Sequence, residues 1–235
     1  MELLWNGLTG ALQLLLERDP LVLHAAWRSL WISGLAVALA ACAGIPLGFL
    51  LSQSRFIGRS LCVVLFRAGM SIPTVLIGLV CYALFSRRGP LGGLDLLYTQ
   101  WGILAGECVL ALPIVVTWTH RAVGGLDPRA AETVWTLGAG PWRRWWELIS
   151  EARVGIALAL LTAFARCLTE LGIAMMVGGN VKYRTRTLTT ATAVETARGE
   201  FDRGVAMSTI LFLVALLVTV LHAWCNRGKR EGEVE

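Results

Sequence analysis

Four charged residues stand inside stretches of the chain that are otherwise apolar: Arg67, Glu107, Arg166 and Glu170. A charged side chain within a bilayer is costly, so it usually faces a protein interior or a water-filled path. Arg166 and Glu170 are four positions apart, so on a helix they share a face and can form an ion pair. That pair would either hold helices together or line a path, and Glu107 fits either role. Arg67 lies within snorkelling reach of a helix end, which favours a structural role.

A second group of polar residues lies in the segment 178–203. It contains three cations, Lys182, Arg184 and Arg186, and then a threonine-rich stretch from residue 187 to 196 whose apolar residues recur at helical spacing. Cations and hydroxyl groups together would attract a tetrahedral dianion without trapping it, because conduction needs contacts that are favourable but weak. A solvated turn with ordinary surface charge is the alternative.

Other kinds of chemistry have no pattern to support them. Lys182 and Lys229 are followed by Tyr183 and Arg230, so the end of a phosphate-binding loop is missing. The histidines are scattered along the chain: His24, His120 and His222. We therefore expect no catalytic residues, no metal site and no cofactor. The net charge of +5 fits contact with anionic lipid or an anionic solute, and we expect no nucleic-acid partner.

The composition indicates that these residues belong to a membrane protein. Hydrophobic residues make up 56 % of the chain and charged residues 16 %, whereas soluble domains contain roughly 45–50 % and about 25 %. Because no backbone polar group can stay unpaired in lipid, long apolar stretches should be helices. Five stretches approach the ~20 residues that cross a bilayer: 23–51, 61–85, 101–119, 154–177 and 205–224. Three prolines should kink these spans: Pro46, Pro73 and Pro113.

The ends of the chain differ from this membrane domain, which we place at residues 21–225. Leucines recur at helical spacing near the N-terminus, so we expect residues 1–20 to form a short amphipathic helix on the membrane surface. Residues 226–235 form a polar tail. The expected fold is all-α, with five transmembrane helices and this one interfacial helix.

The segment between the third and fourth spans, 122–153, contains residues that are typical of helix starts and helix ends. Asp127 followed by Pro128 is typical of a helix start, with a capping carboxylate before a proline at the first helical position. Gly138 and Gly140 break that helix, and Pro141 opens a second one rich in tryptophan and arginine. An interfacial anchor would explain the aromatic and basic residues, but it would not explain two helices joined at a glycine turn.

The stretch Glu132–Trp142 resembles the EAA loop of the permease subunits of ABC importers. It departs from the usual pattern where Thr133 and Val134 replace two alanines. The resemblance implies a type-1 permease fold in which this loop is cytoplasmic and docks on a separate ATPase chain. It also implies which residues make that contact: Glu132, Gly138, Ala139, Pro141, Trp142 and Arg143.

Further motifs are similar to the tungstate-type branch of the molybdate, tungstate and sulfate permeases. They are Gly69–Pro73, Ser86–Gly92, Leu96–Thr99, Ala111–Ile114, Glu151–Arg153, Met175–Asn180 and Arg186–Ala191. The resemblance implies a homodimer, two ATPase subunits, an external solute-binding protein and import of an oxyanion, most simply tungstate. Molybdate, sulfate or another solute remains open as the cargo. A membrane-embedded lipid enzyme or a passive channel is a rival of another class.

The same resemblance sets the topology of the chain in a bacterial or archaeal cell membrane. With the loop in the cytoplasm, five spans place the N-terminus outside and the C-terminus inside. The bias of basic residues toward the inside is weak, because the cations near Lys182 fall on the outer side. We expect the translocation path to include eight residues: Arg166, Glu170, Asn180, Lys182, Arg184, Arg186, Thr189 and Thr190.

Overall fold

The structure, a computed structural model, describes residues 9–10, 20–127, 129, 136, 138 and 140–231. Every regular element in these residues is helical, which confirms the all-α prediction. The interfacial helix predicted for residues 1–20 falls almost entirely outside the described residues. The elements are α2 (Pro20–Gln53), α3 (Arg59–Gly69), α4 (Thr74–Phe85), η1 (Gly92–Leu94), α5 (Gln100–Gly124), α7 (Pro141–Glu151), α8 (Arg153–Leu168), α9 (Gly172–Gly178), α10 (Leu188–Ala197) and α11 (Phe201–Glu231).

Three of these helices, α2, α5 and α11, are long and apolar enough to cross a membrane without a break. Two further pairs pass the same test only together, and each pair is bent, so the described residues provide up to 5 spans. The pair α3 and α4 is bent by 97°. Pro73 stands at this bend and accounts for it. Proline has no backbone N–H to donate a helical hydrogen bond, and its ring disfavours a helical conformation in the residue before it. The kink expected at Pro73 is thus a complete break between two helices.

The fourth predicted span, 154–177, is also divided. Helix α8 ends at Leu168 and the short helix α9 begins at Gly172. The intervening turn is stabilised by Glu170, whose Oε1 accepts a hydrogen bond of 3.1 Å from the Ile173 amide. The expectation of one continuous helix was wrong because an apolar run does not reveal a turn whose free backbone groups are satisfied by a side chain. The bent pair that passes the length test is instead α7 with α8, at 68°.

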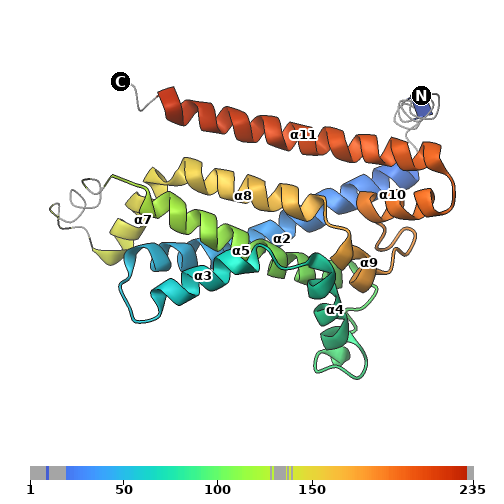
Figure 1. Ribbon diagram of the computed structural model, residues 1–235, viewed down its shortest axis with the longest axis horizontal. Coiled ribbons are helices and arrows are strands. Elements are labelled where there is room, and N and C mark those ends of the chain that lie inside the picture. The colour runs from blue at the N-terminus through green and yellow to red at the C-terminus, as the bar shows by residue number, and fades with distance from the viewer. Residues whose placement is uncertain are drawn as a thin grey trace.

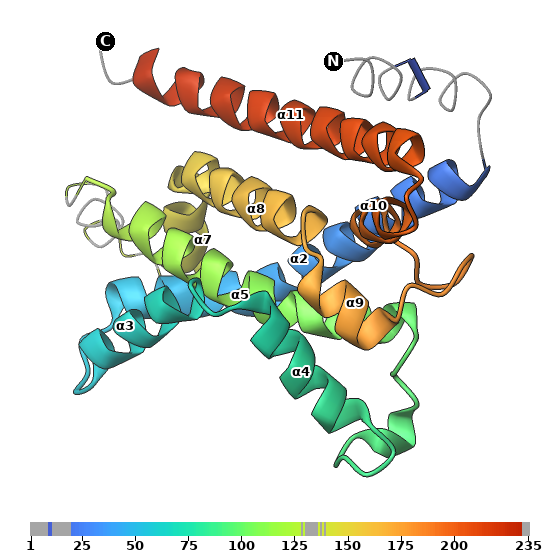
Figure 2. The same cartoon turned by 45° about the vertical axis from the view of Figure 1, so that its right-hand side comes forward.

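Helix α5 forms the centre of the molecule. Within its apolar window 72 % of the residues are buried, compared with 28 % for α11, which lies along one side (Figures 1 and 2). Glycines let α2 approach α5 closely: a Cβ added to Gly48 would stand 2.8 Å from the backbone oxygen of Val116. Small residues at such contacts allow dense helix packing in a membrane.

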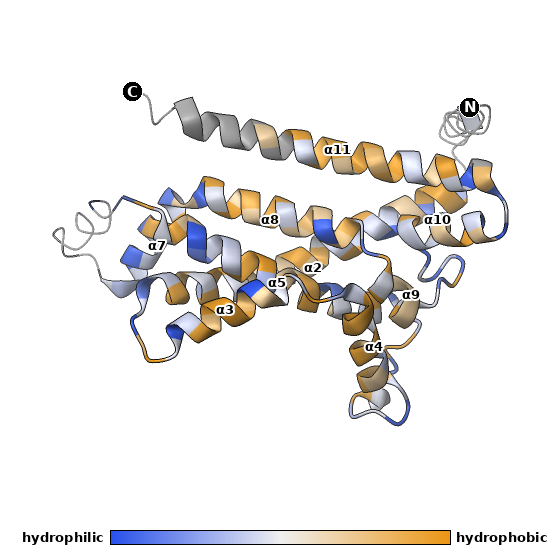
Figure 3. Ribbon diagram, in the orientation of Figure 1, coloured by the Kyte–Doolittle hydropathy of each residue, from blue (hydrophilic) through white to orange (hydrophobic). Residues whose placement is uncertain are grey.

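Polar residues gather at the two ends of the molecule, and apolar residues follow the helices between them (Figure 3). Helix α7 lies at the same end as the C-terminal end of α11, whereas α10 and the start of α2 lie at the opposite end (Figure 1). The two described ends of the chain are therefore on opposite sides of the helical body. This is the arrangement expected for an odd number of spans.

Candidate functional site

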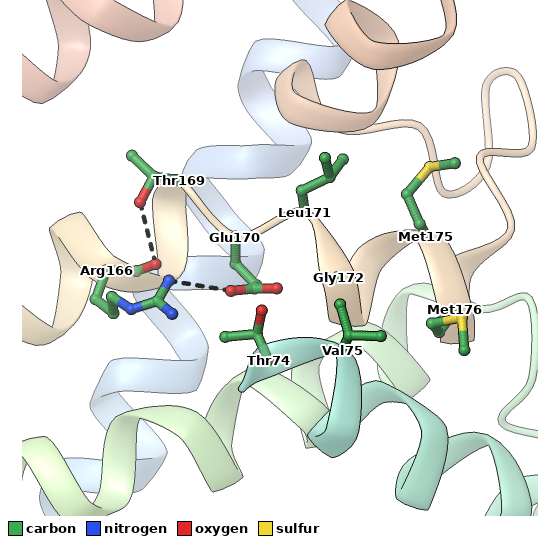
Figure 4. A pocket seen from close by; sticks show the side chains of 9 residues that line it. All are labelled: Thr74, Val75, Arg166, Thr169, Glu170, Leu171, Gly172, Met175 and Met176. Atoms are coloured by element: carbon green, nitrogen blue, oxygen red, sulfur yellow. Dashed lines mark hydrogen bonds and ion pairs between the residues drawn. The ribbon is translucent and has the colours of Figure 1, made fainter. Parts of the chain in front are cut away.

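The bend between α3 and α4 and the break between α8 and α9 meet at one pocket. It has a volume of about 470 Å³ and lies between the start of α4 and the break that separates α8 from α9 (Figure 4). Its lining residues are Thr74, Val75, Arg166, Thr169, Glu170, Leu171, Gly172, Met175 and Met176. The pocket thus brings together the bend at Pro73 and the ion pair that the spacing of Arg166 and Glu170 predicted.

That ion pair is formed. Arg166 Nη1 lies 3.1 Å from Glu170 Oε2, which confirms the pairing. The two partners are unequally enclosed, because the Arg166 side chain is 41 % exposed and the Glu170 side chain only 1 %. The Glu170 carboxylate is therefore occupied on both oxygens, one by the Arg166 guanidinium and the other by the Ile173 amide. Whether the pair also lines a path stays a prediction.

Of the predicted threonines, Thr189 holds the break in place and Thr190 helps to start α10. The Thr189 hydroxyl donates a 2.8 Å hydrogen bond to the backbone oxygen of Glu170. Thr190 and Thr187 form a capping box that starts α10. Both Thr189 and Thr190 are buried, and the bonds they make are to the chain itself. In this conformation Thr189 connects α10 to the pocket, and neither threonine faces open water.

Arg186 is likewise inside the protein. It is 3 % exposed and its Nη1 lies 2.9 Å from Glu195 Oε1. The Arg28 guanidinium donates a 3.0 Å hydrogen bond to the Arg186 backbone oxygen, and Arg198 approaches the same Glu195 carboxylate at 3.7 Å. The sequence predicts Arg186 among the cations at an outer mouth, whereas the structure places it in a buried network. Sequence reasoning missed Arg28 and Glu195, although both charges stand in otherwise uncharged helical faces.

The rest of the outer segment is more open. Lys182 and Arg184 are exposed, as expected of residues at a mouth. Gly179 and Asn180 form a turn with left-handed φ values of 66° and 50°. Glycine is required at position 179 because a Cβ there would come 2.5 Å from the Tyr98 ring. The predicted turn therefore packs against the loop that follows α4.

Two charged residues of the spans lie apart from the pocket lining. Glu107 on α5 is 3 % exposed, and its Oε2 has no hydrogen-bond partner within the described residues. Arg67 on α3 is exposed, which agrees with snorkelling toward a membrane surface. Glu107 is consequently the less readily explained of the two.

The segment 122–153, which resembles the EAA loop, is partly described. Asp127 Oδ1 accepts a 2.9 Å hydrogen bond from the Arg129 amide, which is the contact expected of a capping carboxylate. Gly138 has a φ of 70°, so it adopts a conformation that side chains disfavour. Glu132 and Ala139 lie outside the described residues. Pro141 opens α7 in the first helical turn, as predicted.

Helix α7 exposes an aromatic and basic surface. Trp142 and Trp146 are 75 % and 61 % exposed, and Arg143 is exposed beside them. Trp145 anchors the helix from beneath, with its ring 5.2 Å from that of Trp142 and 6.3 Å from that of Phe49. The helix is thus fixed to the end of α2 while its outer face stays open.

Comparison with known proteins decides what kind of molecule this is. Residues 44–231 match the family described as "Binding-protein-dependent transport system inner membrane component". The chain belongs to this family. The permease is therefore a multi-pass membrane component of an ABC importer, a non-enzymatic subunit that works with an ATPase and a binding protein.

Three similar proteins show how far the likeness extends. The permease is 36 % identical over 200 residues to a "Probable anion ABC transporter permease protein" of Haloferax volcanii, covering 83 % of this chain and 86 % of the relative. It is 34 % identical over 221 residues to a tungstate uptake system permease of Campylobacter jejuni, covering 94 % and 92 %. The inward-facing MetNI methionine transporter superposes with a TM-score of 0.68 at 21 % identity, covering 91 % of this chain and 96 % of that chain. This last likeness concerns the fold alone.

Proposed function

We propose that the permease imports a tetrahedral oxyanion, tungstate, across the cell membrane. One observation carries the proposal: an arginine in a pocket that lies between the bend at Pro73 and the break that separates α8 from α9. Substrate sites of membrane transporters are commonly built where helices are discontinuous near the middle of the bilayer. The likeness to tungstate and anion permeases supports the choice of cargo.

The pocket has the chemistry that a transient anion site needs. Arg166 supplies a guanidinium that suits the oxygens of a tetrahedral anion, and Thr74 and Thr169 supply hydroxyl groups. Because Glu170 pairs with Arg166, the positive charge is moderated, which fits a path that must release what it binds. Lys182 and Arg184 would attract the anion from outside.

The assembly that we propose is a homodimer embedded in lipid. Each copy would contact an ATPase subunit through the exposed face of α7 and an external binding protein at the opposite end. The N-terminus would lie outside and the C-terminus in the cytoplasm of a bacterial or archaeal cell. The position of α7 and the end of α11 on one side of the helical body supports this orientation (Figure 1).

Tungstate and molybdate have the same shape and charge, so a weakly binding path should separate them poorly. We expect the binding protein to set the preference, because specificity is a difference of affinities between ligands. A sulfate cargo is the second candidate.

The test is uptake by the transporter reconstituted in vesicles with its ATPase and binding protein. We expect ATP-dependent uptake of tungstate, and of molybdate when a molybdate-selective binding protein that docks is supplied. Uptake of a sugar or amino acid with no uptake of any oxyanion would contradict the proposed substrate class. A preference that stays with the permease whichever binding protein is supplied would show that the path itself is selective.

A further inference from the structure

We propose that Glu170 is an internal competitor of the transported anion: its carboxylate masks Arg166 until an oxyanion displaces it from the guanidinium. This inference rests on the proposed function. It assigns Glu170 a role beyond helix pairing, because the position that an oxyanion oxygen would take on Arg166 is filled by Glu170 Oε2 at 3.1 Å.

The two oxygens of Glu170 have separate tasks. Oε1 accepts the Ile173 amide and so starts α9, whereas Oε2 contacts Arg166. An anion arriving at the guanidinium needs to replace only the second contact. The break between α8 and α9 can therefore persist during the exchange, and the Glu170 backbone stays fixed by the Thr189 hydroxyl.

The surroundings leave room for an incoming anion only on the side of Arg166. Glu170 is nearly fully buried, but Arg166 is 41 % exposed and opens into the pocket. The Thr74 hydroxyl points toward the Glu170 carboxylate (Figure 4), so the same donor is within the reach of a neighbouring anion. A Cβ added to Gly172 would stand 3.0 Å from Thr74 Oγ1 and 3.1 Å from Glu170 Oε1. The absent side chain at position 172 thus keeps this polar corner open.

The charges explain why the wild-type pocket should bind weakly. A dianion near Arg166 is attracted by one positive charge and repelled by the negative charge beside it, and at nearly equal distances these energies largely cancel. If Glu170 loses its charge, the attraction to Arg166 is no longer offset. The pocket should then hold an oxyanion too tightly for efficient release.

The experiment compares Glu170→Gln with the wild type in the assembled transporter, without binding protein and without ATP. Tungstate binding is measured by titration calorimetry, and uptake is measured in vesicles with the complete system. We expect Glu170→Gln to bind tungstate roughly tenfold more tightly, equivalent to one partly unmasked charge contact, and to import it more slowly. Arg166→Gln added to this variant should abolish the gain in binding.

The matched control is Glu200→Gln. It removes the same charge from an exposed ion pair, in which Glu200 Oε2 lies 2.8 Å from Arg203 Nη1. It should change neither tungstate binding nor uptake. Should Glu170→Gln fail to assemble, Glu170→Asp serves instead, because a shorter carboxylate can still start α9 while reaching Arg166 less well. It should bind tungstate more tightly than the wild type but less tightly than expected for glutamine.

The outcomes separate this inference from the proposed function. If the wild type imports tungstate but neither variant at position 170 binds it more tightly, the masking role is wrong. A gain in binding that survives loss of Arg166 would also overturn it. If the wild-type transporter moves no oxyanion, the proposed function itself fails, whatever the variants bind.

Discussion

At the scale of single residues, the buried charges are accommodated in different ways. Glu170 is held by a guanidinium and a backbone amide, and Arg186 by a carboxylate. Glu107 has one carboxyl oxygen without a hydrogen-bond partner in the described part of the chain. Sequence spacing predicted the pair of Arg166 and Glu170, because four positions equal one helical turn. It could not predict the partner of Arg186, because Glu195 lies across a turn and a helix start.

Removal of one member of the Arg166 and Glu170 pair should be more harmful than removal of both. Arg166→Ala leaves the buried Glu170 carboxylate without its cation. A fully buried pair in soluble proteins loses roughly 3–5 kcal/mol in this way, and the expected loss here is smaller because the Arg166 side chain is 41 % exposed. We expect Arg166→Ala to lower the thermal midpoint of the purified permease more than the double replacement with alanine does. The measurement is a double-mutant cycle on thermal unfolding, and purely additive effects would show that the pair does not stabilise the fold.

Glu107 should tolerate a neutral replacement. An unpaired charge in the bilayer interior costs about 3 kcal/mol, so we expect this buried residue to be uncharged and Glu107→Gln to retain nearly full uptake. Glu107→Lys should reduce expression and uptake strongly, since lysine brings a charge into the same site. Measurement of folded yield and tungstate uptake tests both variants, and severe loss of function in Glu107→Gln would point to a role for its proton.

At the scale of elements, close approach of helices shapes the pocket. Helices α4 and α9 meet through glycines at positions 78 and 172, and a Cβ added at Gly78 would lie 3.1 Å from the Gly172 backbone oxygen. The apolar runs of the sequence predicted that helices occur here. They did not predict the break at Glu170, because this break depends on how one carboxylate satisfies the free Ile173 amide at the start of α9.

Gly172→Ala should disrupt the contact of α9 with α4. Its Cβ would stand 2.9 Å from the Val75 backbone nitrogen, which cannot move aside as a flexible side chain can. We expect a loss of stability of about 1–3 kcal/mol, the usual cost of overpacking, and a marked loss of uptake. Gly93→Ala is the control, because a Cβ added there meets nothing within 4 Å. Equal behaviour of the two variants in thermal unfolding would contradict the close packing described here.

At the scale of the whole molecule, the permease presents different surfaces at its two ends. The end with α7 carries exposed tryptophans, and the opposite end carries α10 and the start of α2 (Figure 1). Coupling to ATP hydrolysis requires that one of these ends contact the ATPase. Helix α7 is suited to this contact because Trp145 packs against the rest of the protein while the Trp142 side chain stays exposed.

Trp142→Ala should therefore weaken binding of the ATPase while leaving the permease in the membrane. Exposed aromatic residues that anchor an interface typically contribute 2 kcal/mol or more, that is, about a thirtyfold change in affinity. Trp27→Ala removes a tryptophan that is also largely exposed, at 67 %, but belongs to the other end of the molecule. Co-purification of the ATPase should fall for Trp142→Ala alone. An equal fall for both variants would argue against α7 as the docking surface.

Taken by itself, the sequence determined the class of this protein, its helical content and the segments that begin and end at prolines and glycines. Long apolar runs have one stable solution in lipid, and Pro141 after Gly140 marks a helix start through local backbone geometry alone. Only the tertiary structure decided that Arg186 is buried against Glu195 and that Arg166 opens into a pocket beside Thr74. The reason is that a charged residue is enclosed or exposed by the helices packed around it, and those neighbours are distant in the sequence.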